Sequence, residues 1–381
     1  MVSKIHKYKL FLAVLVFTLT GCISGPDNRL VVMTPVDKAE TSSILVFSTR
    51  AKSEKAGVVF SSERGQSTQA AIIEISVPPN HKPGQLELPG RLKQLDPDKH
   101  FTARQIDFLK SEDDQAGLDW LNKQTKNNSV LIFVHGYNVT FDSAVFSLAQ
   151  LHHDSGMTAA PVLFAWPSSG RLNGYIYDRE SANYSRDALE TLIEKALIHP
   201  QVEDITLFAH SMGSWLTMEA LRQMAIRKGG LPAKINNIVL AAPDLDVDVF
   251  VRQVEALGAN RPQITIFSSK SDRALAASRF LAGGARLGSV DSGSKDVAKL
   301  LHELGGITVL DLSGVKSGDL LGHSTFLSRP QIVEQLGSGL LNEDAFLKAY
   351  HGPGAVIMDV GRLLTEPFTD TSAPATLGSK K

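Results

Sequence analysis

The sequence has a single cysteine, Cys22, among its 381 residues, so no disulfide can form within one chain. It also lacks an excess of charge, because 39 Lys and Arg residues stand against 40 Asp and Glu residues. No long basic stretch with interleaved aromatic residues is present, which argues against a nucleic-acid partner. Metal, nucleotide and flavin motifs are missing as well, including the glycine-rich phosphate loop, and we therefore expect no cofactor.

The N-terminus carries no apolar run long enough to span a membrane. Its apolar residues 10–19 are too few for a stable transmembrane helix, and a cationic start containing Lys4, Lys7 and Lys9 precedes them. This order of charged and apolar residues is typical of a secretory signal peptide. We expect residues 1–21 to be that peptide.

The apolar run leads into Leu-Thr-Gly-Cys at residues 19–22, which resembles the lipobox of bacterial lipoproteins. The resemblance implies that Cys22 is lipidated, and each buried methylene of its acyl chains would contribute ~0.8 kcal/mol to membrane binding. The polar residues 22–42 would then form a lipidated tether. Ile23, in place of an aspartate, implies an outer-membrane location facing the periplasm. The alternative is a cysteine that merely follows an ordinary signal peptide.

From residue 43 onward the chain reads as one large globular domain, since 43% of all residues are hydrophobic. Short apolar runs alternate with segments of helical periodicity, which predicts parallel strands joined by helical crossovers. We expect strands at residues 43–49, 70–77, 130–134, 162–165, 205–208, 238–241, 264–267 and 307–310. The prediction is an α/β-hydrolase fold over residues 43–350, with a mostly parallel sheet of about eight strands covered by helices on both faces, and a C-terminal tail over residues 351–381.

The strongest chemical signal is the segment 205–213, Ile-Thr-Leu-Phe-Ala-His-Ser-Met-Gly, an apolar strand that runs into Ser211 and then a helix. Such a nucleophile elbow needs small residues two positions before and after the serine, here Ala209 and Gly213. Alanine in place of the commoner glycine weakens the motif slightly. The turn places Ser211 at a helix N-terminus, where the backbone amide of Met212 can stabilise an oxyanion.

A second strand ends in His-Gly-Tyr-Asn at residues 135–138, where an oxyanion-hole segment is expected upstream of the nucleophile. Gly136 allows a close turn, and the second oxyanion donor is expected to be the amide of Tyr137 or a neighbour. His135 precedes Ser211, whereas the order in this fold is nucleophile, acid, base. We therefore expect His135 to serve packing and loop support.

The general base is predicted to be His323, which lies in a loop a short way past the strand ending near Asp311. His302 belongs to an amphipathic stretch, and His351 follows the last helix. The acid has two candidates, Asp272 and Asp244, each of which follows a strand. We prefer Asp272 because it lies one strand later, the commoner location.

Asp244 is followed by two more aspartates, Asp246 and Asp248, and this cluster is more typical of a helix start than of a calcium loop. The loop glycine and the distant glutamate of a calcium site are missing. We therefore expect no metal there.

These features together resemble the bacterial esterase- and lipase-like α/β-hydrolase family of unknown function, whose members are often exported or lipid-anchored. The motifs that carry the resemblance are Phe-Ser-Thr-Arg at 47–50, Asp-Lys-His-Phe at 98–101, Val-His-Gly-Tyr-Asn at 134–138, Ala-Trp-Pro-Ser at 165–168, Tyr-Asp-Arg-Glu-Ser at 177–181 and Ala-Ala-Pro-Asp at 241–244. The expected function is hydrolysis of a small-molecule or lipid ester through a Ser-His-Asp acyl-enzyme mechanism at the cell envelope. Peptidase, thioesterase or acyltransferase activity with the same triad, and a non-catalytic binding scaffold, are the alternatives.

Overall fold

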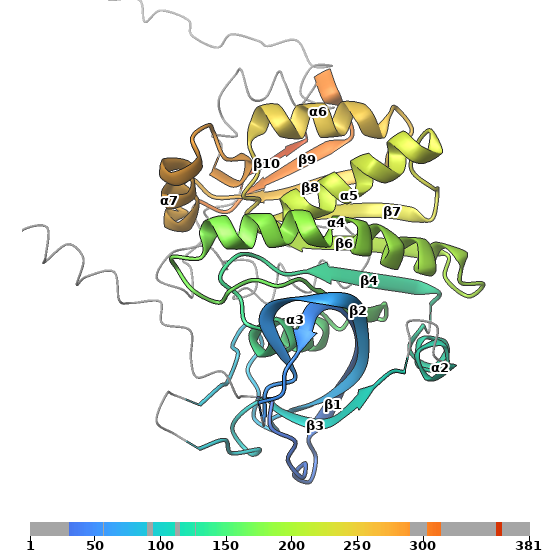
Figure 1. The fold of residues 1–381 in the computed structure, drawn as a ribbon, viewed down its shortest axis with the longest axis vertical. Helices are drawn as coiled ribbons and strands as arrows, with labels where there is room; N and C mark the ends of the chain where they lie inside the picture. Colours follow the sequence, from blue (N-terminus) through green and yellow to red (C-terminus); the bar gives the residue numbers. More distant parts are fainter. Residues whose placement is uncertain are drawn as a thin grey trace, which may run out of the picture.

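The computed structural model describes residues 30–55, 57–89, 94–110, 115–125, 127–289, 303–313 and 356–359, and their arrangement is drawn in Figure 1. The strands are β1 (Glu40–Lys52), β2 (Phe60–Val77), β3 (Thr102–Phe108), β4 (Ser129–Val134), β5 (Ala160–Ala165), β6 (Asp204–His210), β7 (Ile235–Ala241), β8 (Gln263–Ser268), β9 (Ile307–Asp311) and β10 (Val356–Asp359). The helices are α2 (Gln115–Gln124), α3 (Phe141–Ser155), α4 (Tyr175–Ile198), α5 (Met212–Lys228), α6 (Val247–Leu257), α7 (Arg273–Ala282) and the short 3₁₀ helix η1 (Leu287–Ser289).

The strands form one ten-stranded sheet in the order β10-β9-β8-β7-β6-β4-β5-β1-β2-β3. Its central part, from β9 to β1, is parallel, whereas β10 at one edge and β2 and β3 at the other are antiparallel. Parallel neighbours require crossover connections, and a helix from α3 to α7 lies in each connection between successive strands from β4 to β9.

Strand β4 shows how both faces of the sheet are covered. Val130, Ile132 and Val134 belong to a core cluster that includes residues of α4, α5 and α6, whereas Leu131 and Phe133 belong to a second cluster with residues of α3. Alternate residues of a strand point to opposite faces, so an uninterrupted apolar run indicates a strand buried on both sides. The predicted mostly parallel sheet with helices on both faces is confirmed.

The antiparallel strand β3 at one edge of the sheet was missed by the sequence pattern. All eight predicted strands lie within observed ones, but β3 lies between the predicted strands 70–77 and 130–134, where no strand was expected. Its sequence, Thr-Ala-Arg-Gln-Ile-Asp-Phe, is mostly polar because an edge strand is largely exposed. Strands β1 and β2 curve around α3 in Figure 1 and contact it.

The folded part begins earlier than the expected boundary at residue 43. Leu30 is buried in the core cluster beside α3, and the Met33 amide donates to the Ala103 carbonyl at 2.8 Å. Contacts with the folded domain thus occur within residues 30–42, which the sequence assigns to the tether, and β1 begins at Glu40. Likewise β10 pairs with β9 within the predicted tail. Within the described ranges, no helix is both long and apolar enough to cross a bilayer.

Candidate active site

The candidate site lies where the chain reverses direction along the sheet. From β4 the chain moves outward to β5, and β6 then returns to the other side of β4. Carboxyl ends of neighbouring strands meet at such a switch point, which is where ligands bind in open α/β sheets. Val134 at the end of β4 pairs with Ala209 near the end of β6, so Gly136 and Ser211 leave the sheet side by side.

The backbone of Ser211 adopts a conformation that residues other than glycine rarely take. Its φ is 54° and its ψ is −124°, between the end of β6 and the first residue of α5. The surrounding backbone holds this geometry: the Ser211 amide donates to the Ala241 carbonyl at 2.9 Å, and the Ser211 carbonyl accepts from the amides of Ser214 at 3.0 Å and Asp244 at 3.1 Å. Backbone strain that the surrounding structure maintains is typical of functional positions. The sharp turn from β6 through Ser211 into α5 has the shape of the predicted elbow.

Two glycines are required by the close approach of the loops around Ser211. A Cβ atom on Gly213 would lie 2.4 Å from the His135 carbonyl oxygen, and one on Gly136 would lie 2.8 Å from the Ser211 Cβ. Both positions therefore exclude any larger residue. Ala209, the less usual small residue of the motif, is fully buried within β6.

The backbone amides near Ser211 come from the start of α5 and from the loop after β4. Met212 is the first residue of α5, and the first amides of a helix have no acceptor within the helix. In the facing loop, the Asn138 amide donates to Asp178 Oδ2 at 3.1 Å and the Val139 amide to Ser168 Oγ at 3.0 Å. These two amides are therefore engaged by Asp178 and Ser168, and the residue before them in the loop is Tyr137, the second donor that the sequence predicts.

The carboxylate of Asp178, in the first turn of α4, fixes the position of this loop. Asp178 is fully buried, and besides the Asn138 amide it accepts hydrogen bonds from Ser168 Oγ at 2.6 Å and from the Ser169 amide at 2.6 Å. One carboxylate thus joins the loop after β4 to the loop after β5. Because the donors of these three hydrogen bonds are neutral, the bonds are charge-assisted on one side only.

The guanidinium of Arg50 ties the same two loops from the other side. Arg50 is 1% exposed, and it donates to the carbonyls of Val139 at 2.9 Å and of Ser168 at 3.1 Å. We refer to Arg50, Ser168 and Asp178 as the loop clamp. Each of them comes from one of the sequence motifs at 47–50, 165–168 and 177–181, so those motifs were the available signal, although no role was predicted for these residues.

His135 is packed as predicted and is not placed to act as a base. Its ring stacks on Trp166 with centroids 4.9 Å apart, and its two ring nitrogens lie 2.9 Å and 3.0 Å from the carbonyl oxygens of Gly136 and Trp166. Complete burial, with the Arg50 charge acting in the same direction, lowers the pKa of His135 to about 3. The imidazole is therefore neutral at physiological pH.

The two candidate acids differ in their surroundings. Asp244 lies in a buried polar group in which Oδ1 accepts from Ser278 Oγ at 2.5 Å and lies 3.4 Å from Arg286 Nε, while Oδ2 accepts from Tyr175 Oη at 3.1 Å. Asp272 follows β8, is 2% exposed, and accepts the Leu275 amide at 3.0 Å as the N-cap of α7.

The aspartate cluster after β7 includes a helix cap, as the sequence indicates, although the capping residue is Asp246 rather than Asp244. The Asp246 carboxylate accepts the amides of Asp248 and Val249 at the start of α6. The remaining predicted residues, His323 and Cys22, lie outside the described residues, as do the alternative bases His302 and His351.

Comparisons with known proteins agree with this architecture. Residues 112–339 match a family described as alpha/beta hydrolase of unknown function (DUF900). An uncharacterised protein of the cyanobacterium Nostoc, alr1448, is 31% identical over 145 residues, which cover 30% of this chain and 37% of that relative.

Two solved structures match this chain at low identity and with low TM-scores. A carboxyl esterase 2 from the fungus Tuber melanosporum is 14% identical, with a TM-score of 0.37 over 90% of this chain and 98% of that one. An esterase from Pyrobaculum calidifontis is 12% identical, with a TM-score of 0.34 over 80% of this chain and 86% of that one. The family match, rather than these distant structures, identifies the fold as that of an α/β hydrolase.

Proposed function

Because the chain belongs to the family of α/β hydrolases of unknown function, we propose that it is a serine hydrolase that cleaves carboxylic esters through an acyl-enzyme on Ser211. The observation that carries the proposal is the backbone of Ser211, which is held in a strained conformation at the N-terminus of α5 and at the switch point of the sheet. A residue with only a packing role would gain nothing from that geometry.

In the proposed reaction His323 accepts the proton of the Ser211 hydroxyl, and the serine oxygen attacks the ester carbonyl. The amides of Met212 and Tyr137 stabilise the oxyanion of the tetrahedral intermediate. His323 then donates the proton to the departing alcohol. Water, activated by the same histidine, releases the acid and regenerates Ser211.

The proposed acid partner of His323 is Asp272. Both oxygens of Asp244 are already occupied, by Ser278 and Arg286 on one side and by Tyr175 on the other. Asp272 lies two strands beyond the nucleophile strand, at the end of β8, and the strand that leads toward His323 is its neighbour β9. This placement follows the order nucleophile, acid, base along the sheet.

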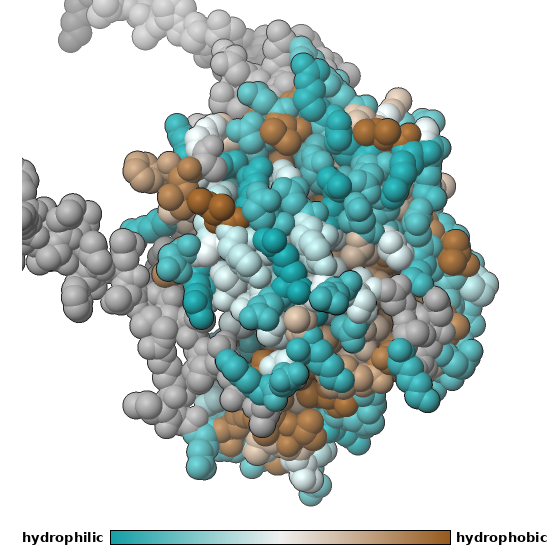
Figure 2. Space-filling view, in the orientation of Figure 1, coloured by the Kyte–Doolittle hydropathy of each residue, from teal (hydrophilic) through white to brown (hydrophobic). Residues whose placement is uncertain are grey.

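An apolar surface on α7, the helix that follows Asp272, supports a lipid-like ester as the substrate. Helix α7 begins directly after Asp272, and its Phe280 and Leu281 are 89% and 64% exposed. These side chains contribute to the brown area over α7 in Figure 2. Large exposed apolar residues are suited to contact with a membrane or an acyl chain. The proposed location at the outer membrane, anchored through Cys22, would bring such a substrate within reach.

Labelling with a fluorophosphonate tests the nucleophile. The full-length protein in detergent should be labelled, and Ser211→Ala should abolish both labelling and hydrolysis of p-nitrophenyl esters. Ser214→Ala is the matched control, because Ser214 is a buried serine on the same helix whose hydroxyl donates to the Ala209 carbonyl and whose backbone amide is kept in the variant. A folded wild type without labelling would contradict the proposal and favour a binding scaffold. Faster cleavage of a p-nitroanilide or a thioester than of the matching ester would change the substrate class.

The membrane anchor has its own test. Metabolic labelling with palmitate should mark the wild type and not Cys22→Ser, and the variant should leave the membrane fraction. Unlabelled wild type would show that Cys22 merely follows an ordinary signal peptide.

A further inference from the structure

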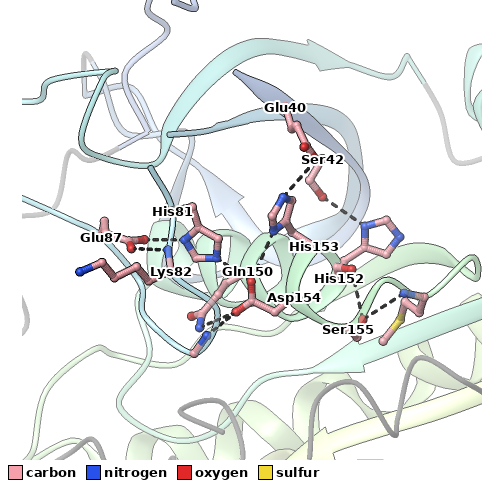
Figure 3. Close-up of polar contacts among 12 residues, drawn as sticks. Glu40, Ser42, His81, Lys82, Glu87, Gln150, His152, His153, Asp154 and Ser155 are labelled. Carbon is pink, nitrogen blue, oxygen red and sulfur yellow. Dashed lines mark hydrogen bonds and ion pairs between the residues drawn. The ribbon is translucent and has the colours of Figure 1, made fainter. Parts of the chain in front are cut away.

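A second polar cluster lies at the other end of α3 from the candidate active site. His153 and Asp154, in the last turn of α3, face His81 from the loop after β2, as Figure 3 shows. One ligand atom from each of the three residues lies within 4.8 Å of the others. Two imidazoles and a carboxylate converge here, and imidazole nitrogen is a preferred ligand of Zn²⁺.

The convergent atoms lie in a largely buried setting. The side chains of His81 and Asp154 are 4% and 0% exposed, and that of His153 is 26% exposed. Asp154 Oδ1 lies 2.5 Å from His81 Nε2 and 3.4 Å from His153 Nδ1. The partly exposed imidazole of His153 places the cluster close to the surface of the protein.

The outward-facing atoms of all three residues are held by further polar groups. His81 Nδ1 lies 2.7 Å from Glu87 Oε2, and His153 Nε2 lies 3.2 Å from Glu40 Oε2. Metal-binding histidines commonly donate their second ring nitrogen to a carboxylate, which fixes the tautomer and turns the other nitrogen toward the metal. Both histidines here have that arrangement.

The carboxylate of Asp154 is oriented in the same way. Its Oδ2 accepts the Gly84 amide at 2.8 Å and Gln150 Nε2 at 3.2 Å, which directs Oδ1 toward the two imidazoles. Each of the three groups therefore offers one atom to a common point and uses another to hold its orientation. This pairing of inner ligands with outer supports is what distinguishes a metal site from a chance meeting of polar side chains.

We propose that His81, His153 and Asp154 form a binding site for a divalent transition-metal ion of the Zn²⁺ type. Two nitrogen ligands and one oxygen ligand favour Zn²⁺, Co²⁺ or Ni²⁺ over Ca²⁺ and Mg²⁺, which prefer oxygen. Water would complete the coordination. The ion would join the loop after β2 to α3, and through Glu40 to the start of β1. The site is independent of the proposed hydrolase activity.

The competing explanation is a proton in place of the metal. A protonated His81 could bridge Asp154 and Glu87 with the same contacts. Burial lowers the pKa of His81, but the hydrogen bonds and charges of Asp154 and Glu87 outweigh burial and hold it above its ordinary value. The experiment must therefore measure metal binding directly.

Metal-depleted full-length protein is titrated with Zn²⁺, and separately with Co²⁺, whose visible absorption reports the coordination. We expect one equivalent to bind, and His153→Ala to weaken binding at least 100-fold with loss of the Co²⁺ bands. Because His153 is partly exposed, this variant should fold, and a circular dichroism spectrum and urea unfolding curve like those of the metal-free wild type would confirm it. His152→Ala is the matched control, since this adjacent histidine lies near Ser42 instead and should bind like the wild type.

Two results would overturn the proposal. The first is no stoichiometric Zn²⁺ binding by the wild type, and the second is equal binding by wild type and His153→Ala. Glu87→Gln provides a further check, because removing an outer support should weaken Zn²⁺ binding about tenfold while leaving the three ligands in place.

Discussion

Helix α3 lies between two buried carboxylates that are held in different ways. Just before its N-terminus, Asp178 fixes the loop at Asn138 and accepts only neutral donors, a serine hydroxyl and backbone amides. At its C-terminus, Asp154 faces the imidazoles of His81 and His153. Hydroxyls and amides do not titrate at physiological pH, whereas imidazoles gain and lose protons and bind metals.

The difference gives each end of α3 a separate role. A geometry that must stay fixed around Ser211 is best supported by donors that cannot change their charge. At the other end, burial raises the pKa of Asp154. The hydrogen bonds from His153, His81 and the Gly84 amide outweigh burial and hold that pKa well below its ordinary value. A carboxylate that stays ionised beside two imidazoles is available to a cation.

The largest expected effect comes from Asp178→Asn, which removes the carboxylate that holds the loop before α3. An asparagine offers one oxygen and one amino group, so at least one of the donors on Asp178 would face another donor. We expect fluorophosphonate labelling of Ser211 to slow about 100-fold, the effect of a misplaced oxyanion donor. The free energy of unfolding should fall by about 2–3 kcal/mol.

The control for this variant is Asp187→Asn on the same helix. The Asp187 side chain is 73% exposed, and its replacement should leave labelling and stability near those of the wild type. If Asp178→Asn were labelled as fast as this control, the loop clamp would have no part in positioning the oxyanion loop.

Zn²⁺ should stabilise the folded protein only through His81, His153 and Asp154 at the C-terminal end of α3. At 100 times the dissociation constant, a ligand that binds only the folded state raises the free energy of unfolding by about 2.7 kcal/mol. Denaturant unfolding with and without Zn²⁺ should give this increment for the wild type and for Asp178→Asn, and none for His153→Ala. Loss of the increment in Asp178→Asn would show that the two ends of α3 are coupled rather than separate.

His135 is a titratable group near the N-terminal end of α3. Its protonation makes the stability of the folded protein depend on pH in acid solution. The unfolded chain protonates this histidine below about pH 6.5, whereas the folded protein does so only near its pKa of about 3. Between these values the unfolded state binds more protons, so the free energy of unfolding falls as pH falls, by about 1.4 kcal/mol per pH unit for one full proton. Above pH 6.5 this contribution is constant.

His135→Gln should remove that slope. Urea unfolding of both proteins at several pH values between about 4 and 6.5 measures it. Since the stacking on Trp166 is also lost, the variant should be less stable at every pH, and the difference between the two proteins should shrink as the pH falls. Parallel curves would mean that His135 takes up a proton in the folded state at ordinary pH.

Local pattern predicted the parts of this molecule in which sequence neighbours act together. The strand that leads to Ser211 and the small residues around it lie within nine positions, and the parallel strands are apolar runs buried on both faces. The edge strand β3 was missed because its exposed residues are polar.

The two carboxylate networks were beyond the reach of local pattern. Asp178 binds Asn138 from 40 positions away, and His81 meets Asp154 across 73 positions. Neither pair has a characteristic spacing, because the sheet and not the local chain brings them together. No motif in the sequence indicates a metal ligand at His81, and no metal was predicted there.

The smallest effect should distinguish the two outer carboxylates of the proposed metal site. Glu40 is 78% exposed and lies 3.2 Å from His153, whereas Glu87 is 21% exposed and lies 2.7 Å from His81. Exposed ion pairs contribute about 0–1 kcal/mol, so Glu40→Gln should weaken Zn²⁺ binding only about threefold, against about tenfold for Glu87→Gln. Competition with a chromophoric chelator resolves such ratios. The reverse ranking would place the metal nearer the surface, with His153 rather than His81 as its principal ligand.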